Sequence, residues 1–252
     1  MSFVEVKRDG HIATVMLNRP ERMNAISTQM TSDLHDALFE VNNDPDVRVV
    51  IFHGEGRAFC AGDDLKEFDL QTASDQATVK HIDGIQQITR DLMFSDKPYI
   101  GAVHGYAVGG GFEWMLNCDL IVAADDLIAF NPEFDWGQFP TGGVTHLMPQ
   151  AIGYQKAMQV MVLGERLSAK HLDDLGLVNW VTSKEEMLTK AREVAETVAS
   201  KSPYSVSALK RLMTRGISGD LSRALDLEGE ITIAAFKTEE AKARSQNFPT
   251  KK

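Results

Sequence analysis

The chain has 252 residues and a mass of 27.9 kDa, which suits one large domain or one domain with an appendage. Hydrophobic residues make up 43% of it, so we expect a substantial core and no general disorder. The net charge of -10 argues against broad binding to nucleic acid or to an anionic membrane. A phosphate-bearing ligand would therefore depend on local cations and backbone donors. The candidate cations are Arg19, Arg22, Lys66 and Lys97.

The two cysteines, Cys60 and Cys118, are far apart in the sequence and form no C-x-x-C pair. This pattern predicts buried small residues in a reducing compartment, without structural disulfides. Residues 1–7 lack the apolar core of a signal peptide, and polar or charged side chains interrupt the apolar stretch at 100–124. We therefore expect a soluble, cytoplasmic protein with no membrane partner.

The first predicted elements form a ββαβ unit. Residues 3–6 and 12–17 are apolar-rich runs on either side of Asp9-Gly10, a dipeptide typical of a tight hairpin turn. Apolar residues from 30 to 41 recur at helical spacing, and 47–52 is a compact run typical of a buried strand.

The alternation of helix and strand then continues, which predicts an α/β domain. We expect a helix at about 83–93, a strand at 99–103, a helix at the glycine run near 110 and a strand at 120–124. After Gly153 the pattern is mostly helical, with segments ending at 164 and 176 and a helix that starts at the capping-box pair Ser183 and Glu186. Two further helices are predicted, one starting at Pro203 and one spanning 221–236.

The glycine run at 109–111 is the most informative feature for function. Glycines let a backbone come close to a ligand, and the start of a helix offers unpaired N–H groups, so this run could stabilise an oxyanion. Glu113 follows in the first helical turn, and Glu133 follows twenty residues later. Two glutamates beside such a site could supply an acid and a base next to an activated carbonyl.

Two other interpretations of the glycine run are open. A dinucleotide-binding loop would need a third glycine, where Trp114 stands, and Gly54-Glu55-Gly56 fails in the same way at Phe59. In a purely structural interpretation the glycines pack a strand against a helix, and Glu113 is a charge at a helix start. The motif alone does not decide between this interpretation and an oxyanion site.

Further segments share a pattern in chain order. They are 17–25 (Leu-Asn-Arg-Pro-Glu-Arg-Met-Asn-Ala), 59–67 (Phe-Cys-Ala-Gly-Asp-Asp-Leu-Lys-Glu), the run 104–119, 132–143, and 163–169 with 176–178. Together they resemble the enoyl-CoA hydratase/isomerase (crotonase) superfamily, over residues 3–181. The resemblance implies an α/β fold, a spiral of ββα units followed by helices that pack subunits, and an active site that polarises an acyl-CoA thioester.

The resemblance also implies the site residues. The backbone N–H groups of Asp63 and Gly110 would polarise the thioester oxygen. Glu113 and Glu133 would hold and activate water for addition at C3, and Glu133 would also deliver the proton to C2. The residues expected to contact the substrate or its CoA group are Arg22, Asn24, Ala25, Ala61, Gly62, Asp64, Leu65, Lys66 and Gly109. We expect no metal and no separate cofactor, because coenzyme A is part of the substrate.

The presence of both glutamates predicts a 2-enoyl-CoA hydratase, since the family's hydratases use both. The alternative is a 3-enoyl-CoA isomerase, or another acyl-CoA enzyme of the superfamily, with Glu133 as the main proton shuttle. A third alternative, from a different class, is non-catalytic RNA binding. The negative charge and the lack of a basic-aromatic stripe oppose it.

The chain departs from the family pattern at a few positions. Asp63 stands where hydratases commonly have a small or apolar residue, and we expect its carboxylate to point to solvent. The loop 140–145 is more like that of isomerase-like members of the family than that of well-known hydratases. Thr141 stands where the superfamily's aromatic dehalogenases carry a nucleophilic Asp, which argues against dehalogenase chemistry. Asp135 would point away from Glu133 if the segment is extended, so we do not expect a third catalytic acid.

We divide the chain into a catalytic core, 1–181, and a C-terminal helical region, 182–252. The helical region carries more apolar residues than a peripheral appendage needs, which predicts a homo-oligomer, a trimer or a hexamer. Its apolar residues are Leu209, Leu212, Met213, Ile217, Leu221, Leu225, Leu227, Ile231, Ile233 and Phe236. The tail is shorter than in many relatives, so Lys242, Arg244, Lys251 and Lys252 are expected to contribute only weakly to CoA binding.

Overall fold

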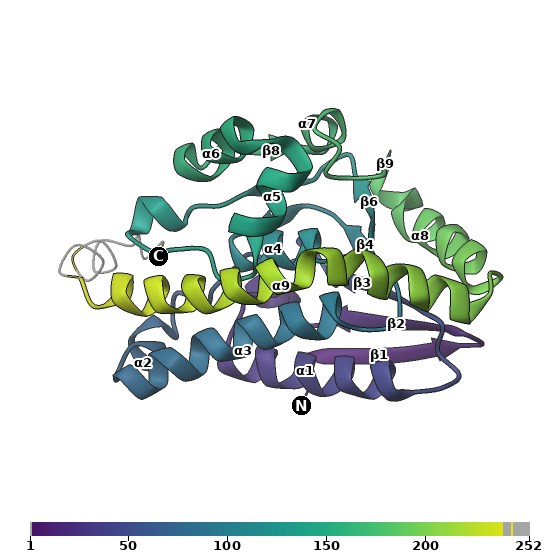
Figure 1. Ribbon diagram of the computed structural model, residues 1–252, viewed down its shortest axis with the longest axis horizontal. Helices are drawn as coiled ribbons and strands as arrows, with labels where there is room; N and C mark the ends of the chain where they lie inside the picture. The colour runs from purple at the N-terminus through teal and green to yellow at the C-terminus, as the bar shows by residue number, and fades with distance from the viewer. Residues whose placement is uncertain (1, 239–242, 244–252) are drawn as a thin grey trace.

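The computed structural model of the chain describes residues 2–238 and 243 (Figure 1). Within them, a six-stranded sheet has the order β1-β2-β3-β4-β6-β9, and a three-stranded sheet has the order β5-β7-β8. The strands of the main sheet are β1 (Val4–Asp9), β2 (Ile12–Leu17), β3 (Val49–Gly54), β4 (Tyr99–Val103), β6 (Leu120–Ala124) and β9 (Trp180–Thr182). The small sheet contains β5 (Tyr106–Val108), β7 (Ile128–Phe130) and β8 (Leu167–Ser168).

The predicted N-terminal hairpin is confirmed. β1 and β2 pair antiparallel with Asp9 opposite Ile12, and Gly10 in the turn has a φ of +58°. From β2 to β9 the strands of the main sheet pair in parallel. The strand predicted at 47–52 starts two residues later, because the N–H of Val47 closes a turn onto the carbonyl of Asp44 at the end of the preceding helix.

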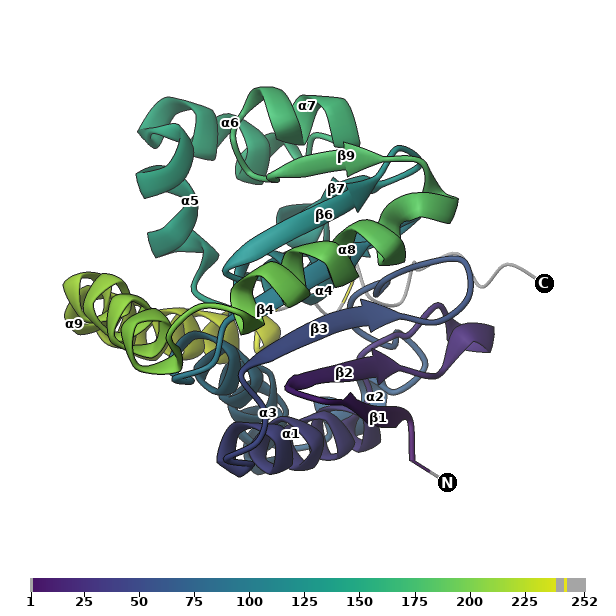
Figure 2. The ribbon, with the colours of Figure 1, turned by 90° about the vertical axis from the view of Figure 1, so that its right-hand side faces the viewer.

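Helices cover both faces of the main sheet. One face packs on α1 (Thr28–Asn43), whose side chains Met30, Leu34 and Leu38 are fully buried. The other face is crossed by α8 (Lys184–Ala199), as Figure 2 shows. Ala191 and Ala195 of α8 lie in one buried cluster with residues of β3, β4 and β6. The sequence-based division at residue 181 thus falls just before a helix that completes the core of the main sheet.

The remaining helices are η1 (Pro20–Arg22), α2 (Phe68–Gln71), α3 (Asp75–Met93), α4 (Gly110–Leu116), η2 (Glu133–Trp136), α5 (Val144–Ile152), α6 (Tyr154–Leu163), α7 (Ala169–Asp174) and α9 (Pro203–Phe236). They pack largely on one another, with α3 against α1 and with α9 against both α3 and α5. α3 begins eight residues before the predicted start at 83. The side chain of Ser74 caps it by accepting a hydrogen bond of 3.1 Å from the N–H of Ala77.

The two helices predicted after Pro203 form one helix, α9, of 34 residues, so that prediction was wrong. No proline interrupts 204–236, and the helix gains support along its length by lying beside α3 (Figure 1). Lys210 anchors its first half with a 2.7 Å bond to Asp119, and Gln86 of α3 donates a 2.5 Å bond to the carbonyl of Leu225. No helix within the described residues is long and apolar enough to cross a membrane.

Candidate active site

The glycine run fixes Glu113 at the start of α4. Gly109 has a φ of +53°, and a Cβ added there would lie 2.7 Å from Oε1 of Glu133. A Cβ at Gly111 would lie 2.5 Å from the carbonyl oxygen of Cys60. Glycine is therefore needed here both for the backbone conformation and for the close approach of the chain. As a result Glu113 lies in the first turn of α4 and is only 1% exposed.

Glu133 lies in η2, on the other side of the same cavity. Both glutamates line this cavity, which has a volume of about 570 Å³. The charge of Glu133 is close enough to raise the pKa of Glu113. Oε1 of Glu113 accepts a 3.1 Å hydrogen bond from the N–H of Thr141, whereas Oε2 of Glu133 has no hydrogen-bond partner within the described residues. Glu133 therefore has a free carboxyl oxygen in a buried position.

The environment favours the protonated form of both glutamates. Burial, followed by the charges of Glu133 and Glu228, raises the pKa of Glu113 well above its ordinary range. Burial, followed by the charge of Asp63, raises the pKa of Glu133 to about 7. A buried pair of carboxyl groups that interact in this way titrates as a unit and can hold one proton near neutral pH. The pair can therefore supply an acid and a base at the same cavity.

Two backbone N–H groups, those of Asp63 and Gly110, complete the polar part of the site. Both residues line the cavity, and neither N–H donates a hydrogen bond to another group of the described chain. The two loops approach each other closely, since a Cβ at Gly62 would lie 2.7 Å from the carbonyl oxygen of Val108. Donors of this kind, held by a rigid backbone, are suited to stabilise a developing oxyanion.

The other residues predicted to bind substrate fall into two groups. Ala61, Gly62, Leu65 and Gly109 line the cavity. Arg22, Asn24, Ala25, Asp64 and Lys66 do not line it. Within this second group, Lys66 is exposed and Arg22 is half-buried.

Asn24 and Asp64 hold the loops that form the cavity. The Asn24 side chain is fully buried and donates to the carbonyls of Ala58 and Phe59, at 2.9 and 3.1 Å. Asp64 forms an ion pair with Arg19, with 2.8 Å between Oδ2 of Asp64 and Nη1 of Arg19, so the candidate cation Arg19 is already paired within the protein. Lys97, another candidate, donates to carbonyls at the end of α1.

The Asp63 carboxylate lies beside the active site, and the prediction that it points to solvent was wrong. Its side chain is 25% exposed, and Oδ1 lies 3.5 Å from Nε2 of the buried His81. Its charge also acts on Glu133. The position of α3, which carries His81, decides this orientation, and the start of α3 was not expected from sequence. Asp135 is exposed and lies in a 3-10 helix, not in an extended segment; it does not line the cavity.

The sequence analysis missed three other residues around the site. Arg166 lines the cavity, and its guanidinium lies 4.6 Å from the centroid of the Phe130 ring. His81 and Glu228 are buried and contact the polar groups described above. Arg166 stands in a segment that carries the family resemblance, but His81 and Glu228 lie on helices whose packing no short motif predicts.

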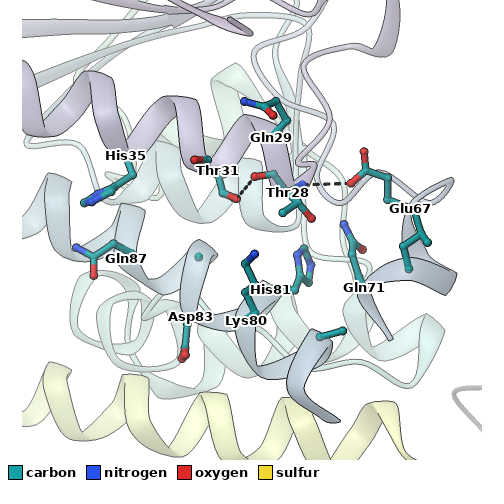
Figure 3. Close-up of a pocket in the computed structure, with 14 residues that line it drawn as sticks. Thr28, Gln29, Thr31, His35, Glu67, Gln71, Lys80, His81, Asp83 and Gln87 are labelled. Atoms are coloured by element: carbon teal, nitrogen blue, oxygen red, sulfur yellow. Dashed lines mark hydrogen bonds between the residues drawn. The ribbon is translucent and has the colours of Figure 1, made fainter. Parts of the chain in front are cut away.

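A second, larger cavity of about 920 Å³ lies between α1, α2 and α3 (Figure 3). Its lining is rich in polar side chains, including Thr28, Gln71, Lys80 and His81, and it contains neither glutamate of the pair. His81 connects the two cavities, because its ring contacts Asp63 in the wall of the first. The smaller cavity is the candidate active site, since it combines the glutamate pair with the free N–H groups.

The comparisons with known proteins agree with this geometry. A family model described as enoyl-CoA hydratase/isomerase matches residues 7–252. A Mycobacterium tuberculosis protein named probable enoyl-CoA hydratase is 33% identical over 93% of this chain and 90% of its own length. The chain therefore belongs to the enoyl-CoA hydratase/isomerase family.

Solved structures show the same fold. Pseudomonas aeruginosa OdaA has a TM-score of 0.89 and 28% identity, with 100% of both chains covered. A monofunctional enoyl-CoA isomerase from Mycobacterium smegmatis has a TM-score of 0.75 and 28% identity, covering 86% of this chain and 95% of its own. The mixed α/β crotonase fold predicted from the sequence is thereby confirmed.

Proposed function

We propose that this protein is a 2-enoyl-CoA hydratase, which adds water across the double bond between C2 and C3 of an enoyl thioester. The observation that carries the proposal is the pair of buried glutamates, Glu113 and Glu133, in a cavity that also presents two unpaired backbone N–H groups. The name of the mycobacterial relative supports the same activity.

In the proposed reaction, the N–H groups of Asp63 and Gly110 bind the thioester oxygen. The reactive form of the coupled pair is the one in which the shared proton is on Glu133 and Glu113 is ionised. Water held between the two glutamates attacks C3, and its proton passes to the carboxylate of Glu113. The π electrons of the C2=C3 bond move toward the thioester, and an enolate with charge on the oxygen forms. The carboxylic acid of Glu133 then protonates C2. Two preorganised donors fit this role, because losing one such donor typically costs about 10²–10³ in rate.

The substrate is proposed to enter with its CoA group near the exposed end of the cavity. Of the four cations predicted from the sequence, exposed Lys66 and half-buried Arg22 remain for its phosphates, since Arg19 and Lys97 have partners within the protein. Arg166, which lines the cavity, is a further cation near the substrate. No separate cofactor is needed for this chemistry.

We also propose a homo-oligomer, a trimer or a hexamer. Large apolar side chains of α9 are exposed, among them Leu209, Leu212 and Met213. The side chains of Ile217 and Leu221, and the tail residues Lys242, Arg244, Lys251 and Lys252, lie outside what the structure describes. An exposed apolar stripe of this kind suits burial against another subunit.

The second candidate is a 3-enoyl-CoA isomerase. Glu133 alone could move a proton between C2 and C4, since one of its oxygens has no partner and its pKa is about 7. The Mycobacterium smegmatis structure shows that the fold also serves an isomerase.

A direct assay separates the two candidates. The protein is incubated with crotonyl-CoA and with 3-hexenoyl-CoA, and the enoyl-thioester absorbance and the products are followed. We expect hydration of crotonyl-CoA to the 3-hydroxyacyl thioester. Conversion of 3-hexenoyl-CoA without any hydration of a 2-enoyl-CoA would show that the isomerase proposal is the correct one.

A further inference from the structure

Glu228, in the middle of α9, is a buried carboxylate that lies outside the cavity itself. It is 1% exposed. Its Oε2 accepts a 2.8 Å hydrogen bond from the N–H of Gly143, and its Oε1 accepts a 3.1 Å bond from the N–H of Thr145. The hydroxyl of Thr145 also donates to Oε1. Both carboxyl oxygens are therefore bound to a single loop, 85 residues earlier in the chain. Burial raises the pKa of Glu228, and the hydrogen bonds from Thr145 and Gly143 act in the opposite direction and favour its ionised form.

These donors belong to the beginning of α5. Gly143 is the residue before the helix and provides no side chain to cap it. The first N–H groups of a helix have no partner within the helix, and they attract negative charge. Glu228 supplies from α9 the cap that the sequence of α5 lacks.

The loop at residues 141–143, which Glu228 binds through Gly143, also contacts Glu113. The N–H of Thr141 donates to Glu113, and Nδ2 of Asn117 donates to the carbonyl of Gly142 at 3.1 Å. A Cβ at Gly142 would lie 2.8 Å from Cβ of Glu113, so the loop and the carboxylate are in tight contact. Residues 141–143 thus lie between two carboxylates, with one N–H directed to Glu113 and another directed to Glu228.

A second contact from α9 fixes the loop at its other end. Thr232, one helical turn after Glu228, donates a 3.2 Å hydrogen bond from its hydroxyl to the carbonyl of Phe139. Thr232 and Phe139 both line the active-site cavity. α9 therefore determines where residues 139–145 lie relative to the glutamate pair.

We propose that Glu228 is a positioning residue, which fixes the loop 139–145 so that its backbone orients the Glu113 carboxylate for water addition. The inference rests on the proposed role of Glu113 in hydration. Glu228 touches neither the cavity lining nor the reacting atoms, so its influence passes through Gly143 and Thr141. Small displacements of a catalytic group can cost about 10²-fold in rate.

The charge of Glu228 also affects the pKa of Glu113, so the pH dependence of the reaction is a second test of the proposal. This charge raises the pKa of Glu113, after burial and after the charge of Glu133. The carboxylates whose charges act on Glu113 are Glu133 from η2 and Glu228 from α9, and the charge of Asp63 acts on Glu133. Replacing Glu228 by Gln removes one of these charges, so the pKa of Glu113 should fall. A general base with a lower pKa stays active to lower pH.

The test compares Glu228→Gln with Glu230→Gln, a matched control in which an exposed glutamate of the same helix is changed. Both variants are made in the full chain, and kcat and KM for crotonyl-CoA are measured from pH 5 to pH 9. For Glu228→Gln we expect kcat to fall by about 10- to 100-fold with little change in KM. The acid limb of the pH profile should move to lower pH. Glu230→Gln should match the wild type in both.

The outcomes are distinguishable. A wild-type protein that hydrates no 2-enoyl-CoA would contradict the proposed function, whereas an active wild type with an equally active Glu228→Gln would overturn the role of Glu228. A reduced kcat with an unmoved acid limb would also overturn it, because mere loosening of the fold predicts that result. If Glu228→Gln does not fold, Thr145→Ala removes one donor to Glu228 and should lower kcat several-fold; an unchanged kcat would again overturn the proposal.

Discussion

The active-site cavity has two walls that are built in different ways. One, the backbone wall, consists of residues 61–63 and 108–111, where two loops present free N–H groups at close range. The other, the loop–helix wall, contains Gln138, Phe139 and Thr141 of the loop and Thr232 and Phe236 of α9, and Glu228 holds this loop from outside the cavity lining. The backbone wall depends on Gly62, Gly109 and Gly111, where a positive φ or the close approach of another backbone segment requires glycine. The loop–helix wall depends on side chains from a distant helix. Glu113 belongs to both, since α4 carries it and the 141–143 loop orients it.

The largest expected effect on the hydration rate comes from replacing the catalytic glutamates, Glu113 and Glu133. Glu113→Gln and Glu133→Gln each keep the shape of the side chain but remove proton transfer, so we expect kcat for hydration to fall by about 10²–10⁴. Binding of a CoA product and the circular dichroism spectrum should be unchanged. Near-wild-type turnover in either variant would exclude that glutamate from the mechanism.

The next effect tests the backbone wall alone. Gly110→Pro removes one N–H at the first residue of α4, a position that tolerates proline, and hydration should fall by about 10²–10³. The control is Gly110→Ala, which keeps the N–H. Its Cβ would lie 2.7 Å from Cδ1 of Ile26, the flexible end of a side chain that can move. If both variants lose the same activity, crowding and not the missing donor is the cause.

Protein stability gives a third test, because burying an ionised glutamate lowers the free energy of unfolding. The pKa of Glu133 is about 7 in the folded protein against an ordinary value of 4.5. The folded state therefore holds a proton that the unfolded chain releases, and stability is lost as the pH rises from 4.5 to 7. Glu133→Gln should raise the free energy of unfolding by roughly 3 kcal/mol above pH 8 and leave it unchanged near pH 4. Denaturant unfolding at the two pH values measures this; an equal effect at both would contradict the assigned cause.

The smallest expected effect concerns the one charged side chain of the backbone wall, Asp63. Asp63→Asn keeps the N–H but removes a charge that raises the pKa of Glu133. Since Glu133 is proposed to act as the acid, its lower pKa should move the basic limb of the pH profile to lower pH, while kcat at the optimum changes by less than about tenfold. Measuring kcat/KM against pH for crotonyl-CoA tests this. An unmoved basic limb would mean that the Asp63 charge does not act on Glu133.

Local patterns of the sequence were enough to predict much of the fold. Asp9-Gly10 predicted the hairpin, and compact apolar runs predicted β4 and β6 at their observed residues. The start of α3 and the continuity of α9 were missed. Ser74 caps α3 in a segment without a strong apolar period, and α9 stays helical through its glycines because it lies along α3 and α5.

The sequence by itself determined the backbone wall and the identity of the glutamate pair. Glycine is the only residue that fits a φ of +53° at Gly109 together with the contact to Glu133. This backbone requirement is therefore visible in the sequence as a glycine at that position. The tertiary structure alone decided that Asp63 turns toward His81 and that Glu228 caps α5. A buried carboxylate needs partners, but many donors could satisfy it, and only the packing of α3 and α9 against the core selects which ones do.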